Sequence, residues 1–64
     1  MTDVMKSILS RVLSEEIAHQ EQWEKQDIEN FGKSMTDRKG IIKEIKDFMK
    51  DNDIKFNDYF YFNA

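Results

Sequence analysis

The scarcity of helix-breaking residues is the feature that most limits what this chain can fold into. Its 64 residues include no proline and only two glycines, at positions 32 and 40. Proline and glycine interrupt helices more strongly than any other residues, so long stretches of the chain can run without a break. The sequence therefore predicts an all-α protein whose main interruption falls at Gly32.

The first predicted helix extends from residue 3 to residue 31. Apolar residues near its start recur at spacings of three and four and so share one face of a helix: Met5, Ile8, Leu9, Val12 and Leu13. Thr2 is the predicted N-cap, because its hydroxyl can accept a hydrogen bond from an N–H group of the first turn. Gly32 is the predicted end, because glycine readily adopts the left-handed conformation that follows a last helical turn.

A second, shorter helix is predicted from residue 36 to residue 51. Its apolar residues follow the spacing of a core-facing helix: Ile41, Ile42, Ile45, Phe48 and Met49. Ser34 or Thr36 is the predicted cap at its start, since both side chains carry a hydroxyl that can accept from the first turn. Asn52 and Asp53 are the predicted end, because both residue types favour turns.

The two predicted helices are joined by a short turn, residues 32–35, which favours antiparallel packing. Opposite charges support the same arrangement. Residues 15–29 contain six acidic residues and one lysine, a net charge of −5, whereas residues 38–50 contain five basic and two acidic residues, a net charge of +3. The sequence therefore predicts one small domain, residues 1–64, folded as an antiparallel helical hairpin with an aromatic C-terminal tail, residues 52–64.

The unequal helix lengths predict self-association. At 1.5 Å per residue, the first helix is about 43 Å long and the second about 23 Å. From a turn at Gly32, the second helix would reach back only to about Ile17 and would leave the apolar face before that residue uncovered. The C-terminal tail, a second copy of the chain or a different protein could cover this face. A second copy, with the tail contributing, is the expected cover, which makes the protein a homodimer built as a helical bundle. The predicted self-association residues are Met5, Ile8, Leu9 and Val12.

Aromatic residues are concentrated near the C-terminus, where residues 54–62 contain five of the eight in the chain. Tyrosine and phenylalanine alternate over residues 59–62 with the period of a strand, and Asn57 and Asp58 could form the turn of a short hairpin. Two interpretations follow: the tail covers the open end of the core, which is the favoured one, or it anchors a partner protein. The predicted partner-binding residues are Trp23, Tyr59, Phe60, Tyr61 and Phe62.

A Glu-x-x-His step at Glu16 and His19 raises the alternative of a metal site. In di-iron carboxylate bundles this spacing presents both ligands on one helix face, and a neighbouring helix supplies another carboxylate, here Glu44. A dimer would double the set. So short a motif also arises often by chance, and a solvated glutamate beside a flanking histidine is the favoured interpretation.

Polar residues interrupt the apolar face of the first helix at Glu16, Gln20 and Asp27. They predict either a polar layer that fixes the register of an oligomer, as buried polar positions do in coiled coils, or a stretch of helix exposed to solvent.

A stripe of lysines on the second helix raises a second alternative, a nucleic-acid-associated regulator; its members are Lys39, Lys43, Lys46 and Lys50. The chain is acidic overall, with a net charge of −3, and it contains no base-reading motif, so a solvated face paired with acids of the first helix is favoured. The acids of residues 15–29 could instead mimic a nucleic acid, although the modest net charge argues against it.

The leading functional prediction rests on elimination. With 64 residues, no cysteine and one histidine, the chain lacks a thiol nucleophile, a phosphate-binding glycine loop and room for a catalytic cleft. Neither a membrane span nor a secretory leader is visible, so a cytoplasmic location is expected. The sequence therefore predicts a non-enzymatic interaction module without a cofactor, which regulates or inhibits a partner protein.

Overall fold

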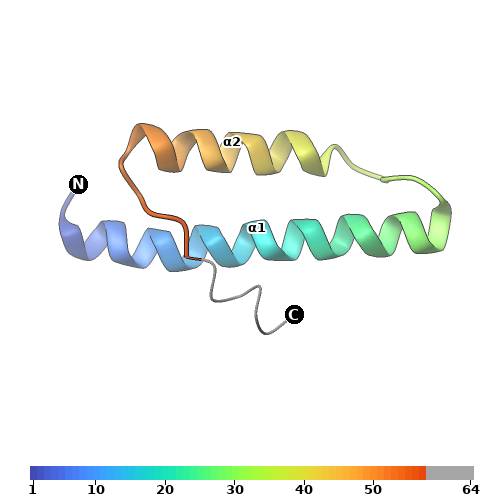
Figure 1. The fold of residues 1–64 in the computed structure, drawn as a ribbon, viewed down its shortest axis with the longest axis horizontal. Coiled ribbons are helices and arrows are strands. Elements are labelled where there is room, and N and C mark those ends of the chain that lie inside the picture. The colour runs from blue at the N-terminus through green and yellow to red at the C-terminus, as the bar shows by residue number, and fades with distance from the viewer. Residues whose placement is uncertain (58–64) are drawn as a thin grey trace.

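The computed structural model describes residues 1–57, which form two helices packed side by side (Figure 1). Helix α1 spans Asp3–Phe31 and helix α2 spans Arg38–Asp51. The helices run antiparallel, and residues 52–57, here named the crossover segment, lead from the end of α2 back to α1. No strand occurs among residues 1–57, so the predicted all-α helical hairpin is confirmed.

Both ends of α1 form as the sequence predicts. The Thr2 side chain accepts a hydrogen bond of 3.2 Å from the Met5 N–H group, which caps the first turn. At the other end Gly32 takes a left-handed conformation with φ of 75°, and its N–H group donates to the Ile28 carbonyl at 2.9 Å. These two local devices fix the length of α1 at 29 residues.

The start of α2 differs from the prediction. Neither Ser34 nor Thr36 caps it; the cap is Asp37, whose carboxylate accepts a 3.1 Å hydrogen bond from the Gly40 N–H group. The Ser34 hydroxyl instead donates to the Thr36 carbonyl within the loop. Ser34 therefore does not cap α2. The connection is therefore residues 32–37 rather than 32–35, and α2 begins two residues later than predicted, at Arg38.

The end of α2 is a Schellman motif centred on Asp53, which has a left-handed φ of 54°. Its N–H group donates to the Lys50 carbonyl at 3.2 Å, and the N–H group of Ile54 donates to the Met49 carbonyl at 2.8 Å. The predicted end at Asn52 and Asp53 is thus confirmed. The motif turns the chain so that Ile54 enters the core beside Met49.

The core lies between the two helices and the crossover segment. Its buried members are Ile17, Ile42, Met49 and Ile54, with Leu9, Leu13 and Ile45 partly buried against them. Leu9 and Leu13 lie well before Ile17, and Lys6 forms an ion pair of 3.7 Å with Asp53. The prediction that the second helix reaches back only to Ile17 is therefore wrong.

The loop explains this longer reach. Residues 32–37 do not form a tight turn at the end of α1. They run back along α1, so that α2 begins beside residues that lie before that end (Figure 1). Arg38, the first residue of α2, hydrogen-bonds to Gln20 and Asp27 of α1 at 3.2 Å. The shift leaves the last turns of α1 without α2 beside them, where Ile28 and Phe31 are exposed.

The crossover segment is tied to α1 by two serines. The Ser10 hydroxyl donates to the Lys55 carbonyl, and the fully buried Ser14 hydroxyl accepts a 2.8 Å hydrogen bond from the Asn57 N–H group. The predicted aromatic hairpin would need a strand at residues 54–56, and the chain is not a strand there. Its other half, residues 59–62, lies outside the described residues.

Replacing Gly32 by alanine tests the left-handed end of α1. A Cβ atom at this position would have open space around it, so any loss of stability comes from the backbone conformation alone. We expect Gly32→Ala to lower the free energy of unfolding by about 1 kcal/mol, measured by urea denaturation at fixed protein concentration. Gly32→Asn is the control, because asparagine tolerates this conformation better; equal losses for both variants would contradict the explanation.

Candidate interaction surfaces

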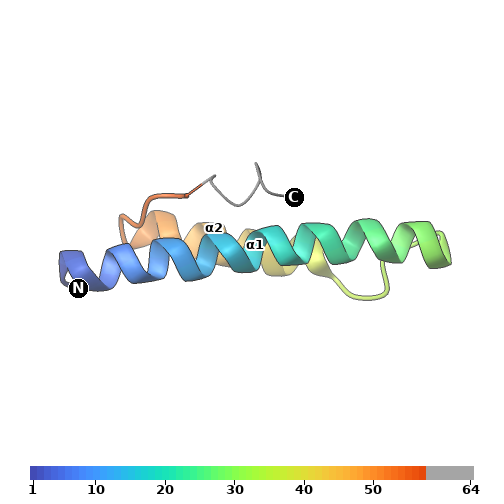
Figure 2. The same ribbon diagram turned by 90° about the horizontal axis from the view of Figure 1, so that it is seen from below.

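One flank of α1, beside the face that packs on α2, carries a row of exposed apolar side chains. Figure 2 shows α1 in front of α2, with the crossover segment along one edge of α1. We name the row of apolar side chains the outer row; its members, with their exposed fractions, are Val4 (69%), Met5 (48%), Ile8 (41%) and Val12 (49%). Of the four residues predicted for self-association, Leu9 alone turns partly into the core.

The width of the apolar surface, not its length, leaves the outer row exposed. Successive residues of a helix are rotated by about 100°, so Leu9, Leu13 and Ile17 face the core while Val12 and Ile8 lie about 100° and 140° around the helix from Leu13, on its flank. A single antiparallel helix with one crossover covers only the first group. Three of the four residues predicted for self-association, Met5, Ile8 and Val12, are therefore uncovered, but for a different physical reason than the one expected.

A second exposed feature surrounds Trp23, which is 41% exposed. The Arg38 guanidinium carbon lies 5.7 Å from the centre of the indole ring, and the His19 ring lies 5.5 Å from it. An arginine within about 6 Å of an indole is attracted by the negative face of the ring. These neighbours hold a large aromatic side chain at the surface, on an α1 face next to α2.

Arg38 is itself held by a network of polar contacts. Its Nε donates to Asp27 Oδ2 at 3.2 Å, its Nη2 lies 3.1 Å from the same oxygen, and its Nη1 donates to Gln20 Oε1 at 3.2 Å. The Gln20 amide in turn donates to Glu16 Oε1 at 2.8 Å. The predicted polar positions therefore do form a layer, but within residues 1–57 it joins the two helices of one chain.

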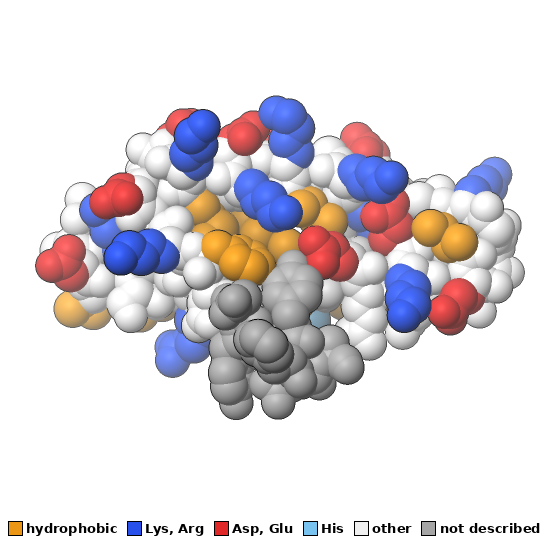
Figure 3. Space-filling view, in the orientation of Figure 1, with side chains coloured by type: hydrophobic (Ala, Val, Ile, Leu, Met, Phe, Trp, Pro, Cys, Tyr) orange, Lys and Arg blue, Asp and Glu red, His pale blue; other side chains and the backbone are white. Residues whose placement is uncertain are grey.

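The predicted charge complementarity between the helices is realised mainly at this layer. Among residues 1–57, the ion pair that links α1 to α2 is the one between Asp27 and Arg38. Lys43 pairs instead with Asp47 of its own helix at 2.9 Å, and this hydrogen bond raises the pKa of the Lys43 ammonium. The lysine stripe of α2 faces solvent, as the basic side chains in Figure 3 show.

The residues of the metal alternative are not assembled into a site. No group of three metal-ligating side chains lies together within residues 1–57. Glu16 is bonded to Gln20, His19 lies 3.8 Å from Glu15 on its own helix, and Glu44 is exposed on α2. Within residues 1–57, the structure therefore does not bring Glu16, His19 and Glu44 together as metal ligands.

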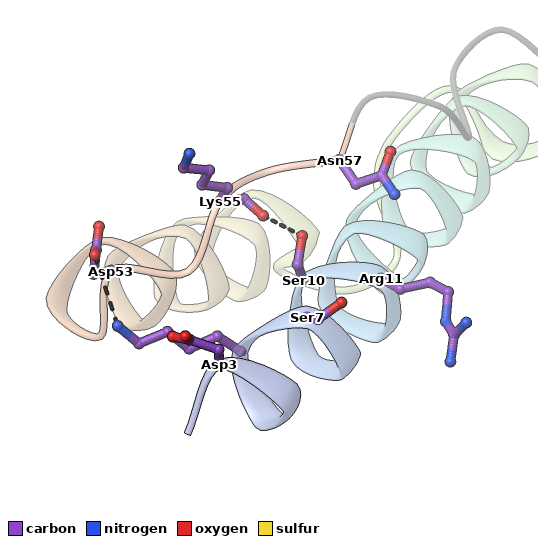
Figure 4. Close-up of a pocket in the computed structure, with 8 residues that line it drawn as sticks. Asp3, Ser7, Ser10, Arg11, Asp53, Lys55 and Asn57 are labelled. Carbon is purple, nitrogen blue, oxygen red and sulfur yellow. Dashed lines mark hydrogen bonds and ion pairs between the residues drawn. The ribbon is translucent and has the colours of Figure 1, made fainter. Parts of the chain in front are cut away.

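A polar groove that the sequence did not indicate lies where the crossover segment meets the start of α1 (Figure 4). Its volume is about 450 Å³, and its lining is Asp3, Lys6, Ser7, Ser10, Arg11, Asp53, Lys55 and Asn57. Cations and anions are mixed in this lining, and Lys6 is already paired with Asp53. The groove exists because residues 52–57 return to α1, and no local motif predicts that return.

Neither helix of the described chain has a long enough apolar stretch to cross a membrane. The predicted partner-binding residues Tyr59, Phe60, Tyr61 and Phe62 lie outside the described residues. Comparison with protein-family models, with curated proteins and with solved structures finds no match for this chain.

Changing Arg38 to lysine tests the polar layer. Lysine keeps the charge but cannot donate to Asp27 and Gln20 together. We expect the free energy of unfolding to fall by about 1–2 kcal/mol, because both acceptors are largely shielded from water and one of them loses its charged donor. The control is the exposed neighbour, Lys39→Arg; a loss no larger than that of the control would show that the layer does not stabilise the hairpin.

Proposed function

We propose that the protein is a non-enzymatic interaction module that self-associates as a homodimer and regulates or inhibits a partner protein. The observation that carries this proposal is the outer row, an exposed apolar strip on α1 beside the residues that face the core. A cytoplasmic setting agrees with the absence of cysteine from the chain.

The size of the chain makes an uncovered apolar strip costly. A domain of about 60 residues buries only about 60% of the surface that its unfolded chain exposes, so its own core supplies little surplus stability. Contiguous apolar patches on small proteins mark places where another surface docks. Burial of the outer row against a second copy would remove further apolar area from water in each chain, which favours self-association.

Trp23 is the residue of the described chain best suited to contact a different protein. Tryptophan and arginine are enriched among residues that dominate binding energies at interfaces. The indole ring of Trp23 and the guanidinium of Arg38 lie together, and Arg38 is fixed by Asp27, so little freedom remains to be lost on binding. This surface is separate from the middle of the outer row, so self-association and partner binding can occur together.

Self-association is tested by placing a charge in the outer row. We expect the wild-type chain to sediment as a dimer at about 100 μM, a concentration that detects contacts of micromolar strength. Ile8→Asp should sediment as a monomer, because a carboxylate would be buried at the contact. The matched control is Ile28→Asp, since Ile28 is similarly exposed on the same helix but lies outside the row. A monomeric wild type, or a dimeric Ile8→Asp variant that keeps its helix content, would contradict the proposal.

Partner binding is tested at Trp23. We expect immobilised wild-type protein to retain a specific protein from an extract of its source, and the purified partner to lose activity on binding. Trp23→Ala should weaken this binding by about tenfold or more, as truncation of a central interface tryptophan usually does. Phe31→Ala is the control, because Phe31 is a large exposed aromatic residue away from Arg38. Equal affinity of the two variants, or no effect on the partner's activity, would contradict the proposed role.

A further inference from the structure

The outer row has the spacing of a coiled-coil seam. Met5, Ile8 and Val12 follow one another at intervals of three and four within α1, which are the intervals between the two core positions of a heptad. All three side chains are at least 41% exposed. Because α1 is already held as a helix by its own hairpin, a second helix could dock here without first having to order this one.

The residues that flank this seam favour one orientation of the second helix. Met5 and Val12 occupy the first core position of their heptads. In a parallel pair of helices, the residue just before this first position faces the residue five places further along on the other helix. Arg11 is such a residue, and Glu16 lies five places after it. In a parallel pair each Arg11 therefore faces Glu16 of the other copy, and the same rule brings Val4 against Leu9.

The structure leaves these charged groups available. Arg11 is exposed, forms no ion pair within residues 1–57, and extends away from the helix in Figure 4. Glu16 is bonded to Gln20 through one carboxylate oxygen, Oε1, at 2.8 Å. The other oxygen of Glu16 remains to accept a bond from a guanidinium.

Antiparallel alignments of the same seam are poorer. If Met5 is placed against Ile8 of the other copy, Val12 projects beyond the start of the other helix, because α1 begins at Asp3. If Ile8 is placed against Val12, Met5 meets Glu15 and the two Arg11 side chains face each other. Each alignment buries two apolar layers, whereas the parallel one buries three and adds two ion pairs.

We infer that the outer row is covered by a second copy of this chain, with the two α1 helices parallel and in register from Val4 to Val12. The inference rests on the self-association proposed above and adds its geometry. The next core position after Val12 is Glu15, and two carboxylates meeting there would repel each other, so the contact ends at that point. The outer row of one copy thus packs against the same row of the other copy. Arg11 of each copy forms an ion pair with Glu16 of the other across the two-fold axis.

Cysteine cross-linking tests the orientation, because the natural chain contains no cysteine. In the parallel dimer, Met5→Cys and Val12→Cys should each form a disulfide-linked dimer under mild oxidation. The first antiparallel alignment separates the two residues 12 by about 16 Å, and the second separates the two residues 5 by about 15 Å. Both distances exceed the reach of a disulfide. Lys43→Cys, exposed on α2, gives the background from random collisions.

Cross-linking of both variants well above the Lys43→Cys background supports the inference. Cross-linking of one or neither, while the wild type still sediments as a dimer, overturns the parallel geometry but leaves the proposed self-association standing. A monomeric wild type overturns both. The two failures are therefore distinguishable.

A charge exchange tests the flanking pair. Arg11→Glu should weaken the dimer by about three- to fivefold, because two modest ion pairs are lost and replaced by repulsion. The double variant Arg11→Glu with Glu16→Arg should recover the wild-type dimer affinity. Failure of the second substitution to restore affinity would contradict the pairing of Arg11 with Glu16, with helix content measured to confirm that each variant is folded.

Discussion

The bonds from the Arg38 guanidinium to Asp27 and Gln20 set the register of the two helices. Arg38 is the first residue of α2, so its place along α1 decides which side chains of the two helices meet. With Arg38 beside Gln20, Ile42 and Met49 reach the core that contains Ile17. A planar guanidinium with several directed donors tolerates little displacement.

The helix ends divide into those that sequence reasoning could predict and those that it could not. Thr2, Gly32 and Asp53 act through hydrogen bonds to residues within five positions, so their roles follow from residue type and local order. The start of α2 depends on which polar side chain of the loop caps the first turn. Several residue types could do so, and in the structure the cap is the carboxylate of Asp37. The reach of α2 depends on Arg38 contacts to residues more than ten positions away, which no local pattern encodes.

The candidate surfaces were predictable to a different degree. Helical spacing grouped Met5, Ile8 and Val12 with Leu9 as one apolar face, but it could not say that Leu9 would turn toward the core and leave the other three exposed. Gln20 and Asp27 were recognisable as polar interruptions, although their partner proved to be Arg38 of the same chain. The groove beside Ser10 could not be predicted, because it requires the return of residues 52–57 to α1.

The crossover segment affects the order in which the molecule can assemble during synthesis. Chains emerge N-terminus first, so α1 is complete long before Ile54, a buried core residue, has been made. The hydrogen bond that the Ser14 hydroxyl accepts likewise cannot form until Asn57 has been synthesised. Until Ile54 has been made, the core between α1 and α2 lacks the part that this residue supplies. The core can therefore close fully only after the crossover segment has been synthesised, because Ile54 supplies part of it.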